Sequence, residues 1–129
     1  MAGSVLTKLI LDVQDLDRSL RFYGELLEID VVNRNNMEGH RLAWLISGNT
    51  ELVLLQQPIS EQNPALDRRG GMLINFQVKG LPALTQQLMK EGVTVLRDLD
   101  MALWGERTFL IADPDGYAVL LSEPVETVH

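Results

Sequence analysis

The 129-residue chain is acidic, with a formal net charge of -7, and 46% of its residues are hydrophobic. This length suits one compact domain, and the composition is that of a globular protein, neither disordered nor membrane-spanning. The sequence contains no cysteine, which excludes disulfides, thiolate metal sites and cysteine nucleophiles. Nucleic acid is an unfavourable partner, because its binding needs a basic patch and the one basic cluster, Arg68-Arg69, falls in an expected loop.

The sequence also carries expectations about cellular location. No apolar run approaches the ~20 residues that a membrane-spanning helix needs. The first eight residues lack the basic start and the long apolar middle of a signal peptide. We therefore expect a cytoplasmic protein with no membrane partner.

The first half of the chain has the pattern of a strand, a helix and three further strands. Asp15 is placed to cap the helix, whose leucines and Tyr23 recur at the spacing of one apolar helical face. Two adjacent asparagines and a glycine predict a loop over residues 33–39. The expected elements are strand 5–13, helix 16–27, strand 29–33 and a hairpin of strands 40–47 and 51–57.

The same order restarts after residues 58–71, whose prolines and glycines predict a linker. Pro82 suits the first turn of a helix, where its missing N–H is tolerated, and Gly92 suits the residue after the helix. Asp113-Pro114-Asp115-Gly116 predicts a type I turn that closes a hairpin. The expected elements are strand 72–78, a helix from Leu81 to Gly92, and strands 93–99, 108–112 and 117–122.

The correspondence between the halves indicates an internal repeat. Residues 41–58 align without a gap with residues 107–124 at an offset of 66, and Val-Leu-Leu-x-x-Pro occurs in both. Chance similarity within an α+β chain is the alternative, but the agreement of order and spacing disfavours it. One half cannot bury both its sheet and its helix alone, so the two copies should pair. We expect one domain over residues 1–129, made of module 1 (about 1–58), a linker (59–71) and module 2 (about 72–129).

Two groups of residues carry a family resemblance. They are VQDLDRS at 13–19 with Phe22-Tyr23, and WGERTF at 104–109 with the Asp-Pro-Asp-Gly turn. With these motifs the sequence resembles the vicinal oxygen chelate superfamily of glyoxalases, bleomycin-resistance proteins and ring-cleaving dioxygenases. The resemblance covers nearly the whole chain. It implies an α+β fold of two βαβββ modules whose curved sheets surround a concave pocket, in a homodimer.

The resemblance also implies where a metal would bind. Enzymes of this family hold a divalent ion through His and Glu side chains of the first and last strands of the modules. Matched to this sequence, the positions fall on Lys8, Leu73, Leu54 and Leu120. None of them is an ordinary ligand, because a divalent ion needs oxygen or imidazole donors. We therefore expect no metal and no other cofactor.

Other candidates for chemistry are equally sparse. Glu51 lies three residues from Leu54, so strand alternation is expected to turn it to the opposite face. His40 alone does not make a metal site, and Asp113 and Asp115 are interpreted as turn-forming residues. No phosphate-binding glycine motif and no recognised nucleophile motif occurs. The sequence does not indicate an enzyme.

Strand alternation predicts an apolar pocket surface with a few polar groups, which is the usual lining of a small-molecule site. Trp44 is expected beside Leu54, and Trp104 precedes the second hairpin; core packing is the alternative role for each tryptophan. The predicted ligand-binding residues are Lys8, Ile10, Asp12, His40, Trp44, Leu54, Gln56, Leu73, Asn75, Gln77, Trp104, Arg107, Leu120 and Ser122.

These features favour a metal-free small-molecule-binding protein, similar in kind to the antibiotic-sequestering members of the family. The negative charge and the tryptophan faces favour a cationic or aromatic ligand, although charge dispersed for solubility is the alternative. Two other functions stay open. One is a lyase, isomerase or dioxygenase of the same superfamily, with His40 or Lys8 as acid or base. The other is a structural or partner-binding module whose pocket is filled by its own leucines.

Overall fold

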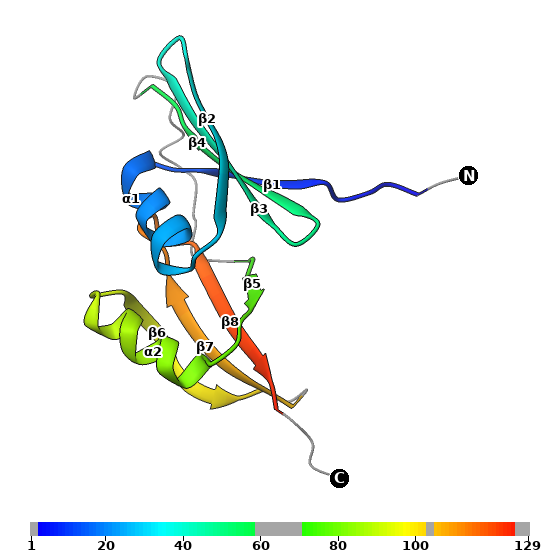
Figure 1. Ribbon diagram of the computed structural model, residues 1–129, viewed down its shortest axis with the longest axis vertical. Helices are drawn as coiled ribbons and strands as arrows, with labels where there is room; N and C mark the ends of the chain where they lie inside the picture. The colour runs from blue at the N-terminus through cyan, green and yellow to red at the C-terminus, as the bar shows by residue number, and fades with distance from the viewer. Residues whose placement is uncertain (1–2, 59–70, 103–104, 126–129) are drawn as a thin grey trace. The chain divides into compact units, whose positions relative to one another are not determined.

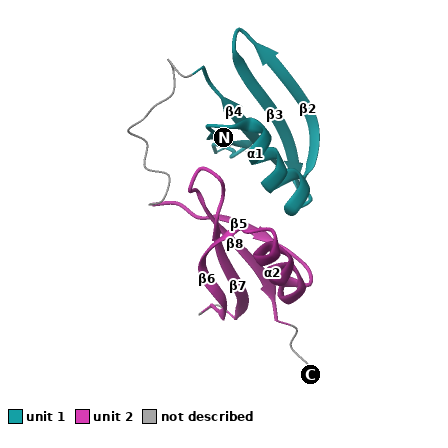
Figure 2. Ribbon diagram, turned by 90° about the vertical axis from the view of Figure 1, so that its left-hand side faces the viewer, with its two compact units in different colours: residues 1–66 teal, residues 67–129 magenta. Residues whose placement is uncertain are grey.

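The chain folds into two compact units, Met1–Leu66 and Asp67–His129 (Figure 2). The structure, a computed structural model, describes residues 3–58, 71–102 and 105–125. The predicted linker 59–71 and the site residue Trp104 therefore lie outside the described residues, except for Gly71. Within the described ranges, no helix combines the length and the apolar character needed to cross a membrane.

Unit 1 places one helical segment on a four-stranded sheet (Figure 1). The strands follow the order β1-β4-β3-β2, with β1 parallel to β4 and the other neighbours antiparallel. Asp15 begins the helix as predicted, because its Oδ1 accepts hydrogen bonds from the N–H groups of Asp17 (3.0 Å) and Arg18 (3.3 Å). The elements are β1 (Lys8–Asp12), α1 (Leu16–Leu20), the π-helical continuation η1 (Arg21–Leu26), β2 (Asp30–Met37), β3 (His40–Ser47) and β4 (Thr50–Gln56).

Unit 2 repeats this arrangement. Its strand order is β5-β8-β7-β6, again with the first and last strands parallel. Pro82 lies in the first turn of the helix, and Gly92 follows the helix at a φ of 80°, both as predicted. The elements are β5 (Ile74–Gln77), α2 (Leu81–Lys90), β6 (Thr94–Met101), β7 (Glu106–Ala112) and β8 (Ala118–Pro124). The repeated order of strand, helix and three strands confirms the predicted fold of two βαβββ modules.

The predicted loop over residues 33–39 is wrong. Strand β2 continues to Met37, and Glu38 and Gly39 alone make the turn, at φ values of 51° and 84°. Two residues at positive φ give a hairpin turn whose twist matches that of the strands, and Met37 pairs directly with His40 across it. The asparagines of this segment have low strand propensity, but the ladder to β3 overrides it.

The Asp-Pro-Asp-Gly segment forms the predicted hairpin turn in unit 2. Asp113 Oδ1 accepts hydrogen bonds from the N–H groups of Asp115 and Tyr117, both at 2.9 Å. Asp113 is 5% exposed, so these bonds hold a buried carboxylate within the turn. Its role in this structure is that of a turn-forming residue, as the sequence indicated.

Equivalent side chains of the two last strands cap the two helices. Gln56 Oε1 accepts a hydrogen bond from the N–H of Leu16 at 2.7 Å, and Glu123 Oε1 accepts one from the N–H of Leu81 at 3.2 Å. Leu16 and Leu81 are the first residues of α1 and α2. Gln56 and Glu123 therefore occupy the same place in the repeat.

This equivalence corrects the gap-free offset of 66. The second hairpin has one residue more in its turn: β3 and β4 close across Gly48 and Asn49, whereas three residues separate Asp113 from Tyr117, whose backbone atoms bond at 2.9 Å. The last strands consequently correspond one residue further along the sequence. Leu54 is equivalent to Leu121, and not to Leu120 as the sequence alignment predicted.

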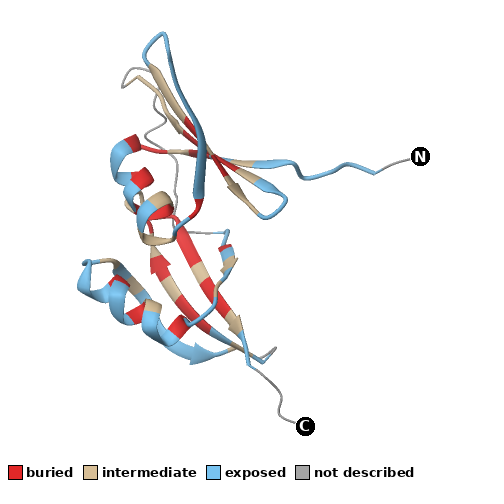
Figure 3. Ribbon diagram, viewed as in Figure 1, coloured by how far each residue is buried: buried red, intermediate tan, exposed pale blue. Residues whose placement is uncertain are grey.

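The core of each unit lies between its helix and one face of its sheet (Figure 3). Because Gln56 and Glu123 reach the helices, every second residue counted from them along β4 and β8 also lies on the helix-covered face. On this face the buried strand residues are Leu11, Ala43, Leu45, Leu52 and Leu54 in unit 1, and Ile74, Phe109, Ile111, Val119 and Leu121 in unit 2. On the opposite face the buried strand residues are Val53, Thr108, Ala118 and Ser122.

Candidate ligand-binding site

The face of each sheet opposite its helix, here called the open face, carries most of the predicted site residues. In unit 1 the parallel ladder assigns residues to this face in pairs, because partners in a ladder point to the same side. The pairs are Lys8 with Glu51, Ile10 with Val53 and Asp12 with Leu55. Strand β3 adds Leu42, Trp44 and Ile46, which are paired with Leu55, Val53 and Glu51.

The expected orientation of β4 is therefore wrong by one residue. The sequence predicts that Leu54 shares a face with Lys8 and that Glu51 lies on the opposite face. In the structure Glu51 shares the face of Lys8, and Leu54 lies on the opposite face. Leu54 is fully buried on the helix-covered face, and Gln56 on the same face caps α1. Lys8 Nζ lies 3.9 Å from Glu51 Oε2 on the open face. Alternation relates residues within one strand, but it does not fix the register between strands, and a shift of one residue exchanges the faces.

An open cavity of about 590 Å³ lies on the open face of unit 1, beside the β2–β3 hairpin. Its volume falls within the range of small-molecule sites, about 300–1,000 Å³. Three apolar side chains and two polar ones form its wall. They are Met37, Leu42 and Leu55, with Glu38 and His40.

His40 is the predicted site residue that lines this cavity. It begins β3, and its Nδ1 lies 3.2 Å from the backbone oxygen of Met37 across the turn. Two neighbouring positions extend the surface: Asp12 is the ladder partner of Leu55, and Trp44 follows Leu42 on the same side of β3. Of the predicted site residues, His40 thus lines the cavity, while Asp12 and Trp44 lie on the same face next to its lining residues.

Sequence reasoning missed Met37, Glu38, Leu42 and Leu55. The first two fall in the segment predicted as a loop. One signal was present: an alternating strand from His40 follows Glu38-Gly39 directly, and a two-residue turn ending in Gly is typical of a hairpin.

The open face of unit 2 carries four predicted site residues. Asn75 Nδ2 donates hydrogen bonds to Ser122 Oγ (3.0 Å) and to the backbone oxygen of Leu120 (2.9 Å). Glu123 points to the helix side, where it accepts a hydrogen bond from Leu81. Because side chains alternate along β8, Ser122 and Leu120 lie on the opposite, open face. Gln77 alternates with Asn75 along β5 and is exposed.

The remaining predicted residues lie elsewhere. Leu73 precedes β5 and is exposed. Arg107 is the ladder partner of Glu123, and its Nη1 lies 4.0 Å from Glu123 Oε1, so it belongs to the helix-covered side of the sheet. The structure does not bring Arg107 to the open face.

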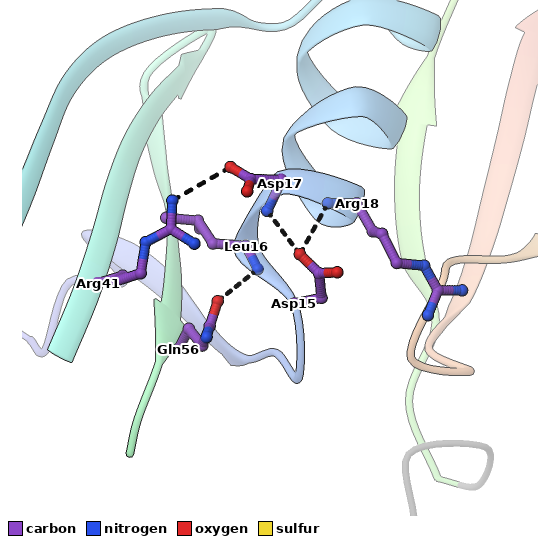
Figure 4. A network of polar contacts seen from close by, with 6 residues as sticks. All are labelled: Asp15, Leu16, Asp17, Arg18, Arg41 and Gln56. Carbon is purple, nitrogen blue, oxygen red and sulfur yellow. Dashed lines mark hydrogen bonds and ion pairs between the residues drawn. The ribbon is translucent and has the colours of Figure 1, made fainter. Parts of the chain in front are cut away.

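Polar contacts at the start of α1 lie on the helix-covered side of the sheet of unit 1 (Figure 4). Arg41 Nη2 lies 3.1 Å from Asp17 Oδ1, beside the cap that Gln56 makes to Leu16. Arg41 is the ladder partner of Gln56, so both side chains extend toward α1. This network ties the far end of the β3–β4 hairpin to the first turn of the helix.

The residues present do not fit a divalent metal. Across residues 3–58, 71–102 and 105–125, no three His, Cys, Asp or Glu side chains cluster closely enough to hold one. With the register corrected, the family's metal-ligand positions carry Lys8, Val53, Leu73 and Leu120. A cationic ammonium group and three hydrocarbon side chains offer no donor to a divalent ion.

Known structures share this fold. The antibiotic-binding protein TnmS3 from Streptomyces sp. CB03234 has a TM-score of 0.73 and 24% identity, with 97% of this chain and 99% of that chain covered. Glyoxalase I from Leishmania major has a TM-score of 0.74 and 24% identity, with 94% and 87% covered. At this identity the likeness concerns the fold alone.

Sequence comparison gives the family. Uncharacterised proteins of Mycobacterium bovis (Mb0911c) and Mycobacterium tuberculosis (Rv0887c) are 36% identical over 56 residues, which is 43% of this chain. The match spans about a third of the length of these curated relatives, 37% and 33%. The model of the Glyoxalase/Bleomycin resistance protein/Dioxygenase superfamily matches residues 6–121. The chain belongs to the Glyoxalase/Bleomycin resistance protein/Dioxygenase superfamily.

Proposed function

We propose that the protein binds a small cationic or aromatic molecule, without a metal, in the cavity on the open face of unit 1. The observation that carries this proposal is the apolar cavity of about 590 Å³ with Glu38 in its wall. The leucines and Met37 supply the apolar contact area, and a thioether packs favourably against an aromatic ring. The Glu38 carboxylate attracts a positive charge.

Two neighbouring residues support the choice of ligand class. Asp12, beside Leu55, adds a second carboxylate on the same face, and Trp44 offers an aromatic surface further along β3. A cation against a tryptophan face gains ~0.5 to 2 kcal/mol. The antibiotic-binding function of TnmS3, which shares the fold, agrees with this proposal.

A second candidate function is a lyase or isomerase that uses no metal. Lys8 and Glu51 favour it, because an amine and a carboxylate 3.9 Å apart on the open face could donate and accept a proton. Both side chains are more than 40% exposed, which is the environment of an ordinary surface ion pair. Binding is therefore the preferred proposal, and the expected cytoplasmic homodimer is kept as part of it.

The test of this proposal uses three probes that share one ring system. Naphthylmethylammonium, naphthylmethanol and naphthoate differ in charge at nearly constant shape. Titration followed by amide chemical shifts should give the largest changes at residues 37–42 and the highest affinity for the ammonium compound.

Glu38→Gln should lower the affinity for the ammonium probe by roughly twofold to fivefold, the weight of a partly exposed charge pair. Glu28→Gln is the matched control, because Glu28 also has a positive φ (56°) and does not line the cavity. Equal affinities for the three probes, or equal effects of the two variants, would contradict the preference for a cation. The absence of shifts at residues 37–42 with all three probes would contradict the proposal as a whole.

A further inference from the structure

A second cavity in unit 1 has the opposite chemical character. It measures about 340 Å³ and lies between α1 and the β2–β3 hairpin. Its lining residues are two arginines, two asparagines and three leucines. We call it the arginine groove; it is lined by Leu16, Leu20, Arg34, Asn35, Asn36, Arg41 and Leu42.

The strand register brings the two arginines together. Arg34 is the ladder partner of Ala43, which is fully buried on the helix-covered face, and Asn36 is the partner of Arg41. Arg34, Asn36 and Arg41 therefore point to the same side of the sheet. Arg34 and Arg41 are diagonal neighbours, a relation in which Cβ atoms lie ~7 Å apart and long side chains can meet.

The groove reverses the sign of the chain's overall charge. The whole sequence carries a net charge of -7, yet no carboxylate belongs to the lining of this groove. Asp17 contacts Arg41 through one nitrogen, Nη2, at 3.1 Å (Figure 4). This contact orients the guanidinium group, which has five N–H donors in all, and Arg34 adds a second positive charge.

The apolar part of the lining defines the rest of the ligand. Leu16 and Leu20 are buried residues of α1 that reach the lining, so the inner end of the groove carries a small hydrocarbon surface. A bare inorganic anion would gain nothing from such a surface, whereas a carboxylate with a short apolar body would use both parts. We propose that the arginine groove binds a small organic carboxylate of this kind.

This site is separate from the cavity of the proposed function. The arginines of the groove point to the helix-covered side of the sheet, whereas the other cavity lies on the open face, and the two linings share only Leu42. Their proposed ligands differ in charge, so either proposal can be contradicted while the other is supported. The experiment therefore reads both regions at once.

The probe is hexanoate, compared with hexanol, hexylammonium and inorganic sulfate by amide chemical shifts on the intact chain. Hexanoate should shift residues 16–20 and 34–36, whereas the other three should leave them nearly unchanged. Arg34→Gln should weaken hexanoate binding by roughly fivefold or more, since a hydrogen bond to a charged group is lost. Arg41→Gln should weaken it as well.

Arg97→Gln is the matched control, because Arg97 is an exposed arginine on the corresponding strand β6 of unit 2. It should leave hexanoate binding unchanged. Equal binding of hexanol would show that charge is not read, and equal binding of sulfate would show that the apolar wall is not used. Either result overturns the proposal, as would unchanged affinity in Arg34→Gln protein with an intact spectrum. Shifts confined to residues 37–40 would assign hexanoate to the other cavity and also overturn it.

Discussion

At the scale of single residues, a few side chains fix where elements begin. Gln56 and Glu123 satisfy N–H groups at the helix starts, which have no partner within the helix. Glu123 does more than Gln56, because its Oε2 also accepts from the N–H of Gly80. Gly80 occupies the cap position of α2 and has no side chain to serve that purpose. The cap of α2 is therefore supplied by a strand 43 residues away in sequence.

Removal of this cap should destabilise unit 2. Glu123→Ala deletes both acceptors and should lower the free energy of unfolding by about 0.5 to 2 kcal/mol, the usual value of an N-cap. Glu123→Gln keeps one acceptor, as unit 1 does with Gln56, and should cost less. Urea unfolding followed by circular dichroism measures both. Equal stability of the alanine variant and the natural protein would show that the cap contributes nothing.

At the scale of elements, local chemistry predicted what is locally determined. The helix starts at Asp15 and Pro82 and the turn at Asp113 were predictable, because each rests on side chains within a few residues. The length of β2 and the register of β4 were not predictable, since they are set by neighbouring strands. Strand alternation was enough to predict that the open face is largely apolar. The lining of the cavity was not predicted, because it includes Met37 and Glu38 from the hairpin that the sequence indicated as a loop.

The hairpin turn at Gly39 should be sensitive to a side chain. Gly39 has a φ of 84°, and a Cβ there would lie 3.2 Å from Pro58 Cγ. Gly39→Ala should lower the free energy of unfolding by about 1 to 2 kcal/mol from the left-handed conformation alone, and further from the contact. Gly48→Ala is the control, because its φ is 58° with no atom within 4 Å. Urea unfolding should rank Gly39→Ala as the less stable variant, and the reverse order would contradict the geometry.

The corrected register makes neighbouring leucines of β8 unequal. Leu121 is 0% exposed on the helix-covered face, whereas Leu120 is half-buried on the open face. Leu121→Glu should cost several kcal/mol, because it buries an unpaired carboxylate, and it should unfold unit 2. Leu120→Glu should be tolerated with a much smaller loss. Thermal unfolding of both variants decides, and similar losses would refute the assignment of faces.

At the scale of the whole molecule, the exposed sheet edges bear on assembly. Strands β2 and β6 lie at the edges of their sheets, every residue of β2 is exposed, and β6 is exposed except for Val95. Unpaired edges and exposed apolar residues such as Met37 and Met101 favour association with another surface. We predict a homodimer. Light scattering at micromolar concentration should give twice the 14.5 kDa of one chain, and a stable single-chain mass would contradict the prediction.

The tripeptide Val-Leu-Leu occupies residues 53–55 and 119–121 in equivalent strands, yet its middle leucine points to the helix in one copy and away from it in the other. When a strand is apolar on both faces, its own residues do not determine which face packs against the helix. The packed face is instead determined at the ends of the strand, by the length of the turn before it and by the helix-capping residue after it. Insertion or deletion of one turn residue can therefore turn such a strand over without changing any of its own residues. In a duplicated chain, this gives one copy a new surface while the architecture persists.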